Sequence, residues 1–197
     1  RCCSSAASDV YKRQVIMETA SSDLPLAVDM DGTLILSDMS VLSVRRVLTR
    51  RPWLIPSFVI KEITGRRAEW KRDLGRLLKF EPSELAYHES FLEWLTGEHA
   101  RGRTLILATA SDRIVAERVA AHVGMFSDVM ASDNDYNLRD TKKAEALVAR
   151  FGESGFGYAG NSHHDVSVWK RCSQVIVVNP DSGVLDRLGD SVDIVFE

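Results

Sequence analysis

Short apolar runs alternate with helical segments, and this alternation constrains the fold more than any other feature. Runs with the length and composition of strands lie at residues 24–28, 104–108, 128–131, 156–159, 174–178 and 193–196. Between them, apolar residues recur with helical spacing over residues 114–123 and 142–151, and each segment is followed by glycine, the residue typical of a helix C-terminus. Strands that alternate with helices predict βαβ units. We therefore expect a three-layer α/β fold with a central parallel sheet.

Residues 38–98 interrupt this alternation. They are rich in helix formers and are broken by Pro52, Pro56, Gly65 and Pro82. We expect a small helical cap inserted after the first strand, with one helix starting at residues 82–84, and a core made of residues 17–37 and 99–197. Residues 42–82 hold eleven Lys or Arg and four Glu or Asp. This basic stretch is either a solvated helix face or a lid that faces an anionic substrate or membrane surface.

Residues 1–16 do not look like part of a folded domain. They are largely polar, lack periodicity and resemble translated sequencing-adapter read-through, so we expect a disordered, non-native tail. Three cysteines form no disulfide framework, which favours a cytoplasmic setting. The formal net charge of −3 argues against a nucleic-acid-binding protein. No apolar run approaches the ~20 residues of a membrane-spanning helix.

Polar residues follow three of the expected strands, after Val28, Ala108 and Ala159. In parallel α/β sheets, ligands bind beyond the carboxyl ends of the strands. These three strand ends therefore predict one shared active site.

Five residues directly after the first strand carry the strongest chemical signal: Asp29, Met30, Asp31, Gly32 and Thr33. Carboxylates at positions i and i+2 can enter one pocket while the intervening side chain points away. One carboxylate can bind a metal and attack phosphorus, while the other serves as general acid and base. Gly32 permits a sharp turn after them. The alternative is a structural Asp-rich turn.

The segment AVDMDGTLI resembles the first motif of the haloacid dehalogenase-like (HAD) phosphatase superfamily, which has a Rossmann-like core. The resemblance implies that Asp29 forms an aspartyl-phosphate and that Asp31 is the acid and base. It also implies a Mg²⁺ ion bound by the Asp29 carboxylate and the backbone carbonyl of Asp31. Met30, Gly32 and Thr33 are then expected to line the substrate site.

The second and third motifs of the superfamily have counterparts here. Thr109 ends an apolar strand, and its hydroxyl, with the amides of Ala110 and Ser111, is expected to bind phosphoryl oxygens. Lys142 and Lys143 both stand at a helix start, where the superfamily has a lysine that neutralises the phosphoryl group. Lys143 fits the spacing to Leu147 better; the alternative is an ordinary surface lysine.

The fourth motif resembles GDxxxD and reads Gly160 to Asp165 in this chain. Asp165 matches its second acid, whereas Asn161 replaces the first. Both are expected to serve the Mg²⁺ ion, and Asn161 offers a neutral carbonyl oxygen that lowers the negative charge of the site by one. We expect His163 and His164 to face solvent or the substrate rim, and Cys172 to be a packed thiol.

Several runs, among them LATASD, NLRDTKKAEALVARFG and YAGNSHHDVSVW, resemble the HAD domains at the N-terminus of bacterial UbiA-like prenyltransferases. That group similarly has Asn in the fourth motif. The resemblance implies that a membrane prenyltransferase domain is missing after residue 197, and that the full-length protein is membrane-associated.

Two principal hypotheses follow. The first is a Mg²⁺-dependent phosphomonoesterase that acts on a small phosphorylated substrate, such as a sugar phosphate or a polyprenyl-linked phosphate. The second is a HAD module with little or no turnover that binds to or regulates a UbiA-like membrane partner; Asn161 favours it. Transfer of the phosphoryl group to an acceptor other than water is a third alternative.

Overall fold

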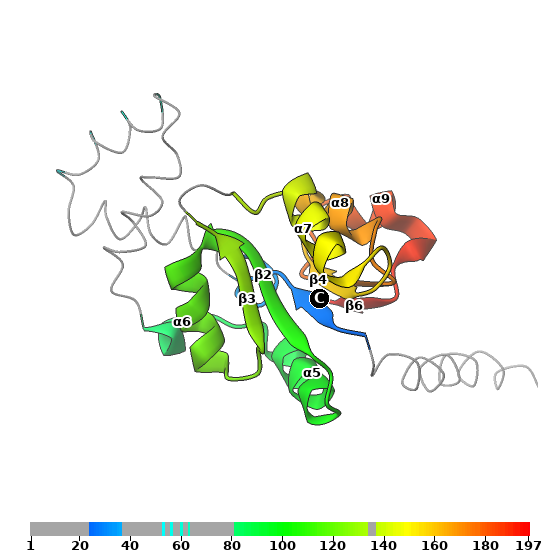
Figure 1. Ribbon diagram of the computed structural model, residues 1–197, viewed down its shortest axis with the longest axis horizontal. Coiled ribbons are helices and arrows are strands. Elements are labelled where there is room, and N and C mark those ends of the chain that lie inside the picture. Colours follow the sequence, from blue (N-terminus) through cyan, green and yellow to red (C-terminus); the bar gives the residue numbers. More distant parts are fainter. Residues whose placement is uncertain are drawn as a thin grey trace, which may run out of the picture.

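The computed structural model describes residues 24–36, 81–133 and 137–197, together with residues 53, 56, 60 and 63. Its described strands form one parallel sheet in the order β3-β2-β1-β4-β5-β6 (Figure 1). The strands are β1 (Leu26–Val28), β2 (Leu105–Asp112), β3 (Asp128–Ser132), β4 (Gly157–Gly160), β5 (Gln174–Val178) and β6 (Ile194–Phe196). The first strand in the chain therefore lies near the middle of the sheet, between β2 and β4.

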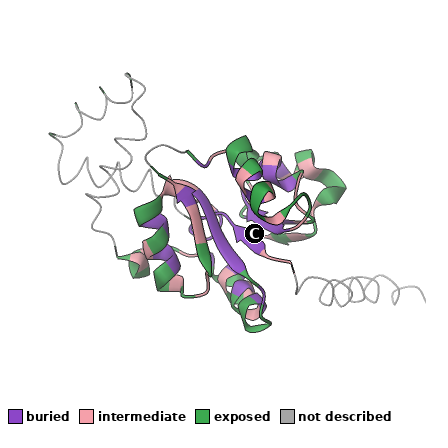
Figure 2. Cartoon of the chain, in the orientation of Figure 1, coloured by how far each residue is buried: buried purple, intermediate pink, exposed green. Residues whose placement is uncertain are grey.

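Helices cover both faces of this sheet, which confirms the predicted three-layer α/β fold. One face carries α5 (Glu89–Ala100) and α6 (Arg113–Val123), and the other carries α7 (Thr141–Phe151), α8 (Val166–Trp169) and α9 (Val184–Leu188). Successive strand residues enter opposite cores: Leu26 and Val28 pack on the α5/α6 side, and Ala27 packs on the α7/α8 side. Strands β1 and β4 are buried throughout (Figure 2) because both of their faces are covered.

The sequence signals for the helix ends and strands agree with the structure to within a few residues. At the start of α6, the Asp112 carboxylate accepts a hydrogen bond from the backbone N–H of Ile114. At its end, Gly124 adopts the left-handed conformation with φ 73°. Strand β2 runs further than predicted, to Asp112, because an irregular register lets its last residues still pair with β3.

The helix predicted from residue 82 differs from the structure. Pro82–Glu84 form only a 3-10 turn, η2, and the α-helix begins at Glu89, with His88 as its N-cap. Between them the chain is extended, and Tyr87 forms an antiparallel bridge with Ile35. Pairing with the segment after β1 outweighs the local helix signal here. Phe91 and Leu95 of α5 then enter the main core, so this helix packs directly on the sheet.

A buried arginine joins three elements at the amino ends of the strands, opposite the polar strand ends. Arg103 precedes β2, and its guanidinium donates to the carbonyl of Leu24 at 2.9 Å and to Oε1 of Gln174 at 2.7 Å. It also pairs with the Glu98 carboxylate of α5 at 2.7 Å. All of its charge is therefore compensated by hydrogen-bonded partners inside the protein.

Two expectations concern residues outside the described ranges: the tail at residues 1–16 and most of the cap at residues 38–98. Within the described ranges, no helix has both the length and the apolar composition needed to cross a membrane.

Candidate active site

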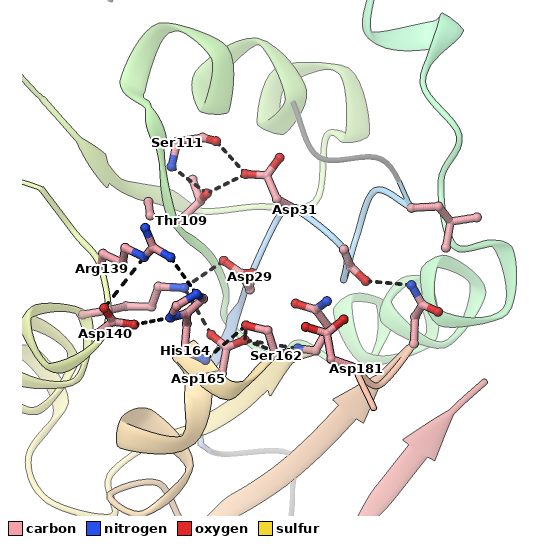
Figure 3. A pocket seen from close by; sticks show the side chains of 16 residues that line it. Asp29, Asp31, Thr109, Ser111, Arg139, Asp140, Ser162, His164, Asp165 and Asp181 are labelled. Carbon is pink, nitrogen blue, oxygen red and sulfur yellow. Dashed lines mark hydrogen bonds and ion pairs between the residues drawn. The ribbon is translucent and has the colours of Figure 1, made fainter. Parts of the chain in front are cut away.

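A pocket of about 510 Å³ opens at the carboxyl ends of the central strands (Figure 3). The segments after β1, β4 and β5, the last residues of β2 and the start of α7 supply its walls. Residues from all four predicted motifs line it: Asp29, Asp31, Thr109, Lys143, Asn161 and Asp165. The strand order explains the convergence, because β2, β1 and β4 are neighbours and their ends meet at one edge.

Asp29 is fixed at the base of the pocket by β4 and α7. Its backbone N–H donates to the carbonyl of Ala159, continuing the pairing of β1 with β4. Its Oδ1 accepts a hydrogen bond from the ammonium of Lys143 at 2.8 Å. Only 7% of the residue is exposed, so this carboxylate has one direction of approach, from the pocket.

Lys143 belongs to a buried network with Asp29, Tyr158 and Asp165. Its ammonium also donates to the Tyr158 hydroxyl at 2.9 Å and lies 3.4 Å from Asp165 Oδ1, while Tyr158 donates to that same oxygen at 2.6 Å. Burial lowers the pKa of Lys143, but the charges of Asp29 and Asp165 outweigh this and raise it overall. The ammonium therefore stays charged inside the protein. Lys142, by contrast, is exposed.

Every oxygen of the Asp165 carboxylate is engaged by protein donors. Oδ1 accepts from Tyr158 and Lys143, and Oδ2 accepts from the backbone N–H groups of Asn161 and Ser162 and from the Ser162 hydroxyl. Burial raises the pKa of Asp165, but Lys143 and these hydrogen bonds lower it overall. The capping box around the 3-10 turn η3 (His163–Asp165) creates this arrangement. Its contacts make Asp165 a group that positions Lys143 and Asn161.

Asp29 and Asp165 share the Lys143 ammonium, and Asp31 adds a third negative charge that acts on Asp29. Burial first, and then the negative charges of Asp165 and Asp31, raise the pKa of Asp29 to about 7, against the opposing effect of Lys143. The pocket base thus holds more negative charge than its own lysine balances. A divalent cation is the kind of ligand that relieves such an excess.

Asp31 lies on the opposite wall, held by hydroxyl groups at the end of β2. Its Oδ2 accepts from Ser111 Oγ at 2.5 Å and is 3.5 Å from Thr109 Oγ1 (Figure 3). Thr109 Oγ1 in turn accepts from the backbone N–H of Ser111 at 3.0 Å. Asp31 is only partly buried and contacts hydroxyl groups, whereas Asp29 is buried against the ammonium of Lys143. The two acids therefore have different surroundings, which suits different chemical roles.

Gly32 and Asn161 approach each other closely across the pocket floor. Gly32 has φ +80°, and a Cβ at this position would lie 2.3 Å from Asn161 Nδ2. Glycine is therefore required both for the turn after Asp31 and to leave space for Asn161. This contact places the amide of Asn161 against the loop that carries both acids.

Two predicted substrate contacts are not supported by the structure. Met30 is fully buried in the core on the α5/α6 side, because the residue between the two acids points away from the pocket. Thr33 is also fully buried, and its hydroxyl has no hydrogen-bond partner. Gly32, Ala110 and Ser111 do line the pocket.

Residues of the pocket and of the buried network beneath it were also missed by the sequence analysis. Tyr158 lies within an apolar strand, where nothing marks its hydroxyl as part of the site. Arg139 and Asp140 precede α7, and Asp181 follows β5. The pattern Arg-Asp directly before the helix that carries Lys143 was the available signal for the first two. His164 is exposed at the rim, as expected, and burial raises the pKa of the Cys172 thiol to about 12, as suits a packed thiol.

The donor atoms around Asp29 suit a magnesium ion. Asp29 and Asn161 both line the pocket, their side chains carry carboxylate and amide oxygens, and Mg²⁺ prefers oxygen ligands. Among the described residues, no group of three His, Cys, Asp or Glu side chains is arranged to hold a metal. A magnesium ion bound here would use a carboxylate together with amide and backbone carbonyl oxygens, with fewer charges than an all-carboxylate site.

The strand order and the two acids directly after β1 define a hydrolase domain with a Rossmann-like fold. Residues 26–170 match the haloacid dehalogenase-like hydrolase family, and the chain belongs to that family. The uncharacterized protein y4nM of Sinorhizobium fredii is 32% identical over 155 residues, which are 79% of this chain and 30% of that protein. The chain thus spans less than a third of the length of this curated relative.

Solved structures of low identity share the fold. A protein of unknown function from Bordetella pertussis has a TM-score of 0.62 at 18% identity, covering 90% of this chain and 99% of its own. A predicted phosphoglycolate phosphatase from Haemophilus somnus has a TM-score of 0.61 at 15% identity, covering 90% and 95%. A substrate-bound phosphoserine phosphatase has a TM-score of 0.58 at 15% identity, covering 89% and 93%.

Proposed function

We propose that this domain is a phosphomonoester hydrolase in which Asp29 is the nucleophile and Asp31 is the general acid and base. The observation that carries the proposal is the pairing of two unlike acids across one pocket. Asp29 is buried against Lys143, while Asp31 is partly exposed and bonded to hydroxyl groups. Family membership and the phosphatases among the structural neighbours agree with it.

In the first step, a carboxylate oxygen of Asp29 attacks phosphorus and the bond from phosphorus to the ester oxygen breaks. Asp31 donates its proton to the departing alkoxide, so an alcohol leaves and an aspartyl-phosphate remains. In the second step, Asp31 accepts a proton from water as the water oxygen attacks the same phosphorus. Inorganic phosphate is released and Asp29 is regenerated.

The surrounding residues stabilise the charge that develops on the phosphoryl oxygens. Lys143 supplies a fixed positive charge beside Asp29. The Thr109 hydroxyl and the backbone amide of Ala110 supply hydrogen-bond donors at the end of β2, while the Ser111 amide holds Thr109 Oγ1 in place. Bound Mg²⁺ would neutralise phosphoryl charge, held by Asp29, Asn161 and the backbone carbonyl of Asp31, with Asp165 positioning Asn161 and Lys143.

Replacing Asp29 by Asn tests this proposal. It keeps the size of the side chain and removes the nucleophile, so turnover of p-nitrophenyl phosphate with magnesium should fall by about 10³-fold or more. Acid-quenched wild-type protein incubated with ³²P-labelled substrate should carry a hydroxylamine-labile label that Asp29→Asn lacks. Equal turnover by both proteins would refute the assignment.

Asn161 favours a second candidate, a binding or regulatory module with little turnover. A neutral amide in place of an acid weakens the charge available to hold magnesium, and the described residues offer no cluster of three metal-binding side chains. The expected UbiA-like membrane prenyltransferase partner belongs to this candidate and stays a prediction. Phosphate release across sugar phosphates and polyprenyl phosphates separates the candidates, and Asn161→Asp should raise activity if charge limits it.

A further inference from the structure

A second polar network, the rim network, lies at the mouth of the pocket and consists of Arg139, Asp140 and His164. Arg139 Nη2 and His164 Nε2 are 2.6 Å apart, and His164 Nδ1 and Asp140 Oδ1 are 2.8 Å apart (Figure 3). Arg139 Nε lies 3.7 Å from Asp140 Oδ2. The network joins the start of α7 to η3, above the buried Lys143 and Asp165.

Hydrogen-bond chemistry fixes the roles within the rim network. A guanidinium can only donate, so His164 Nε2 must accept from Arg139. The imidazole proton is then on Nδ1, and it is donated to the Asp140 carboxylate. His164 therefore bridges Arg139 and Asp140 and orients the plane of the Arg139 guanidinium.

The backbone of Asp140 is strained, and the strain serves this geometry. Asp140 has φ 52° and ψ −123°, a region that residues other than glycine rarely occupy. It is the N-cap residue of α7, yet its side chain makes no capping hydrogen bond. An aspartate normally stabilises a helix by capping it. Here the Asp140 carboxylate contacts His164 instead. Helix α7 therefore lacks the stabilisation of a side-chain cap, and the carboxylate holds the rim network.

Arg139 has N–H donors that its contacts with His164 and Asp140 do not use, and these donors are open to the pocket. A guanidinium has five N–H groups, and Arg139 contacts His164 through Nη2 and Asp140 through Nε. Its side chain is 39% exposed and lines the pocket. The other lining cation among the described residues, Lys143, already contacts three oxygen atoms. Arg139 is thus the cation best placed to meet an anion beyond the reacting phosphoryl group.

We infer that Arg139 binds a second anionic group, a carboxylate or phosphate, carried by the leaving-group part of the substrate. The inference rests on the proposed phosphatase function and narrows its substrate class. A planar guanidinium held by two partners is suited to bind the two oxygens of such a group side by side. A substrate with no second anion would leave this arrangement unused.

Three compounds of matched length test the inference: ethyl phosphate, phosphoglycolate, and ethylene glycol bisphosphate. Wild-type protein with magnesium should favour one or both doubly anionic compounds in kcat/KM. Arg139→Ala should reduce kcat/KM for the favoured compound about 10- to 100-fold more than for ethyl phosphate, mainly through KM. Arg139→Lys should retain part of the preference. Arg171→Ala removes an exposed, ion-paired arginine remote from the pocket and serves as the matched control.

Binding measurements separate this inference from the proposed function. Isothermal titration calorimetry of Asp29→Asn with the same compounds, with and without Arg139→Ala, measures binding affinity in the absence of turnover. Weaker binding of phosphoglycolate or ethylene glycol bisphosphate after Arg139→Ala, without an equal loss for ethyl phosphate, supports the inference even if no protein turns over. Equal losses for all three compounds, or no loss, overturn it. Turnover unaffected by Asp29→Asn overturns the proposed function alone.

Discussion

Two polar networks connect the start of α7 to the segment after β4, and they differ chiefly in burial. The buried network of Asp29, Lys143, Tyr158 and Asp165 lies beneath the pocket, where Lys143 and Asp165 are almost fully excluded from water. In the rim network, the side chains of Arg139, Asp140 and His164 are 39–57% exposed. The same two segments are therefore joined once in a low dielectric and once at the surface.

This difference in burial indicates that the buried network stabilises the fold, whereas the rim network can contribute to substrate recognition. Breaking a buried ion pair leaves an uncompensated charge, which costs about 3–5 kcal/mol. Exposed ion pairs contribute about 0–1 kcal/mol because water and salt screen them. The buried network should therefore set both folding and catalysis, whereas the rim network can change with the substrate at little cost to the fold.

The largest effect is expected for Lys143→Ala. Loss of the ammonium leaves Asp29 and Asp165 buried without their shared partner, so the free energy of unfolding should fall by about 3–5 kcal/mol at pH 8. Turnover should be lost as well. Urea denaturation measures the change, and Lys142→Ala, on the exposed side of the same helix turn, is the control. Equal stability of the two variants would contradict the charge balance described for the pocket base.

Asp29→Asn should give the next largest change, in the opposite direction. The pKa of Asp29 is about 7 in the folded protein, against about 3.9 when unfolded. Protonated Asp29 stabilises the folded protein fully below the pKa of the unfolded chain. This stabilisation is lost as pH rises through the folded pKa of about 7. Without metal, the free energy of unfolding of the variant should exceed that of wild type by on the order of 1–3 kcal/mol at pH 8. This difference should be smaller at pH 5.

Thermal unfolding in chelator at both pH values measures this difference. Added magnesium should then stabilise the wild type more than Asp29→Asn, because the carboxylate is a proposed ligand. A gap that widened toward low pH would show that the charge on Asp29 is not what destabilises the folded protein.

Tyr158→Phe should have a moderate effect. The change removes the hydroxyl that donates to Asp165 and accepts from Lys143, so unfolding should become easier by about 1–3 kcal/mol. Turnover should fall because both partners lose a positioning contact. Tyr87→Phe is the control, since it removes a single hydroxyl-to-carbonyl bond outside the network. A drop in turnover shared by both variants would argue against a specific role for Tyr158.

The smallest effect on stability is expected for His164→Ala. Because this network is exposed, the free energy of unfolding should change by no more than about 0.5 kcal/mol. The preference for doubly anionic compounds should nevertheless weaken, since Arg139 loses the imidazole that orients it. Urea denaturation measures the change in stability, and the kinetic comparison of the three compounds measures the change in preference. A destabilisation as large as that of Tyr158→Phe would remove the distinction between the networks.

The sequence predicted the sheet and much of the pocket because both depend on local patterns. Apolar runs marked the strands, and polar residues directly after them identified Asp29, Asp31 and Thr109. Parallel strand ends share an edge, so their convergence followed from topology. Lys143 was favoured over Lys142 by spacing alone, and the structure places its ammonium against Asp29.

What the sequence did not predict depends on long-range placement. Tyr158 reads as one more apolar strand residue, and only the position of α7 brings its hydroxyl to Lys143 and Asp165. The rim network needs a strained backbone at Asp140, which no composition or periodicity signals. Thr33 was assigned to the pocket because it follows the two acids, but the turn at Gly32 carries it inward.

The buried Arg103 cluster bears on the accuracy of the catalytic arrangement at the far end of the sheet. Strands that are apolar on both faces can slide by two residues and still bury similar surfaces. Such a slip would move Asp29 about 7 Å along its strand. By donating to the carbonyl of Leu24, just before β1, and to the side chain of Gln174 at the start of β5, Arg103 favours one register of these two strands across the intervening β4.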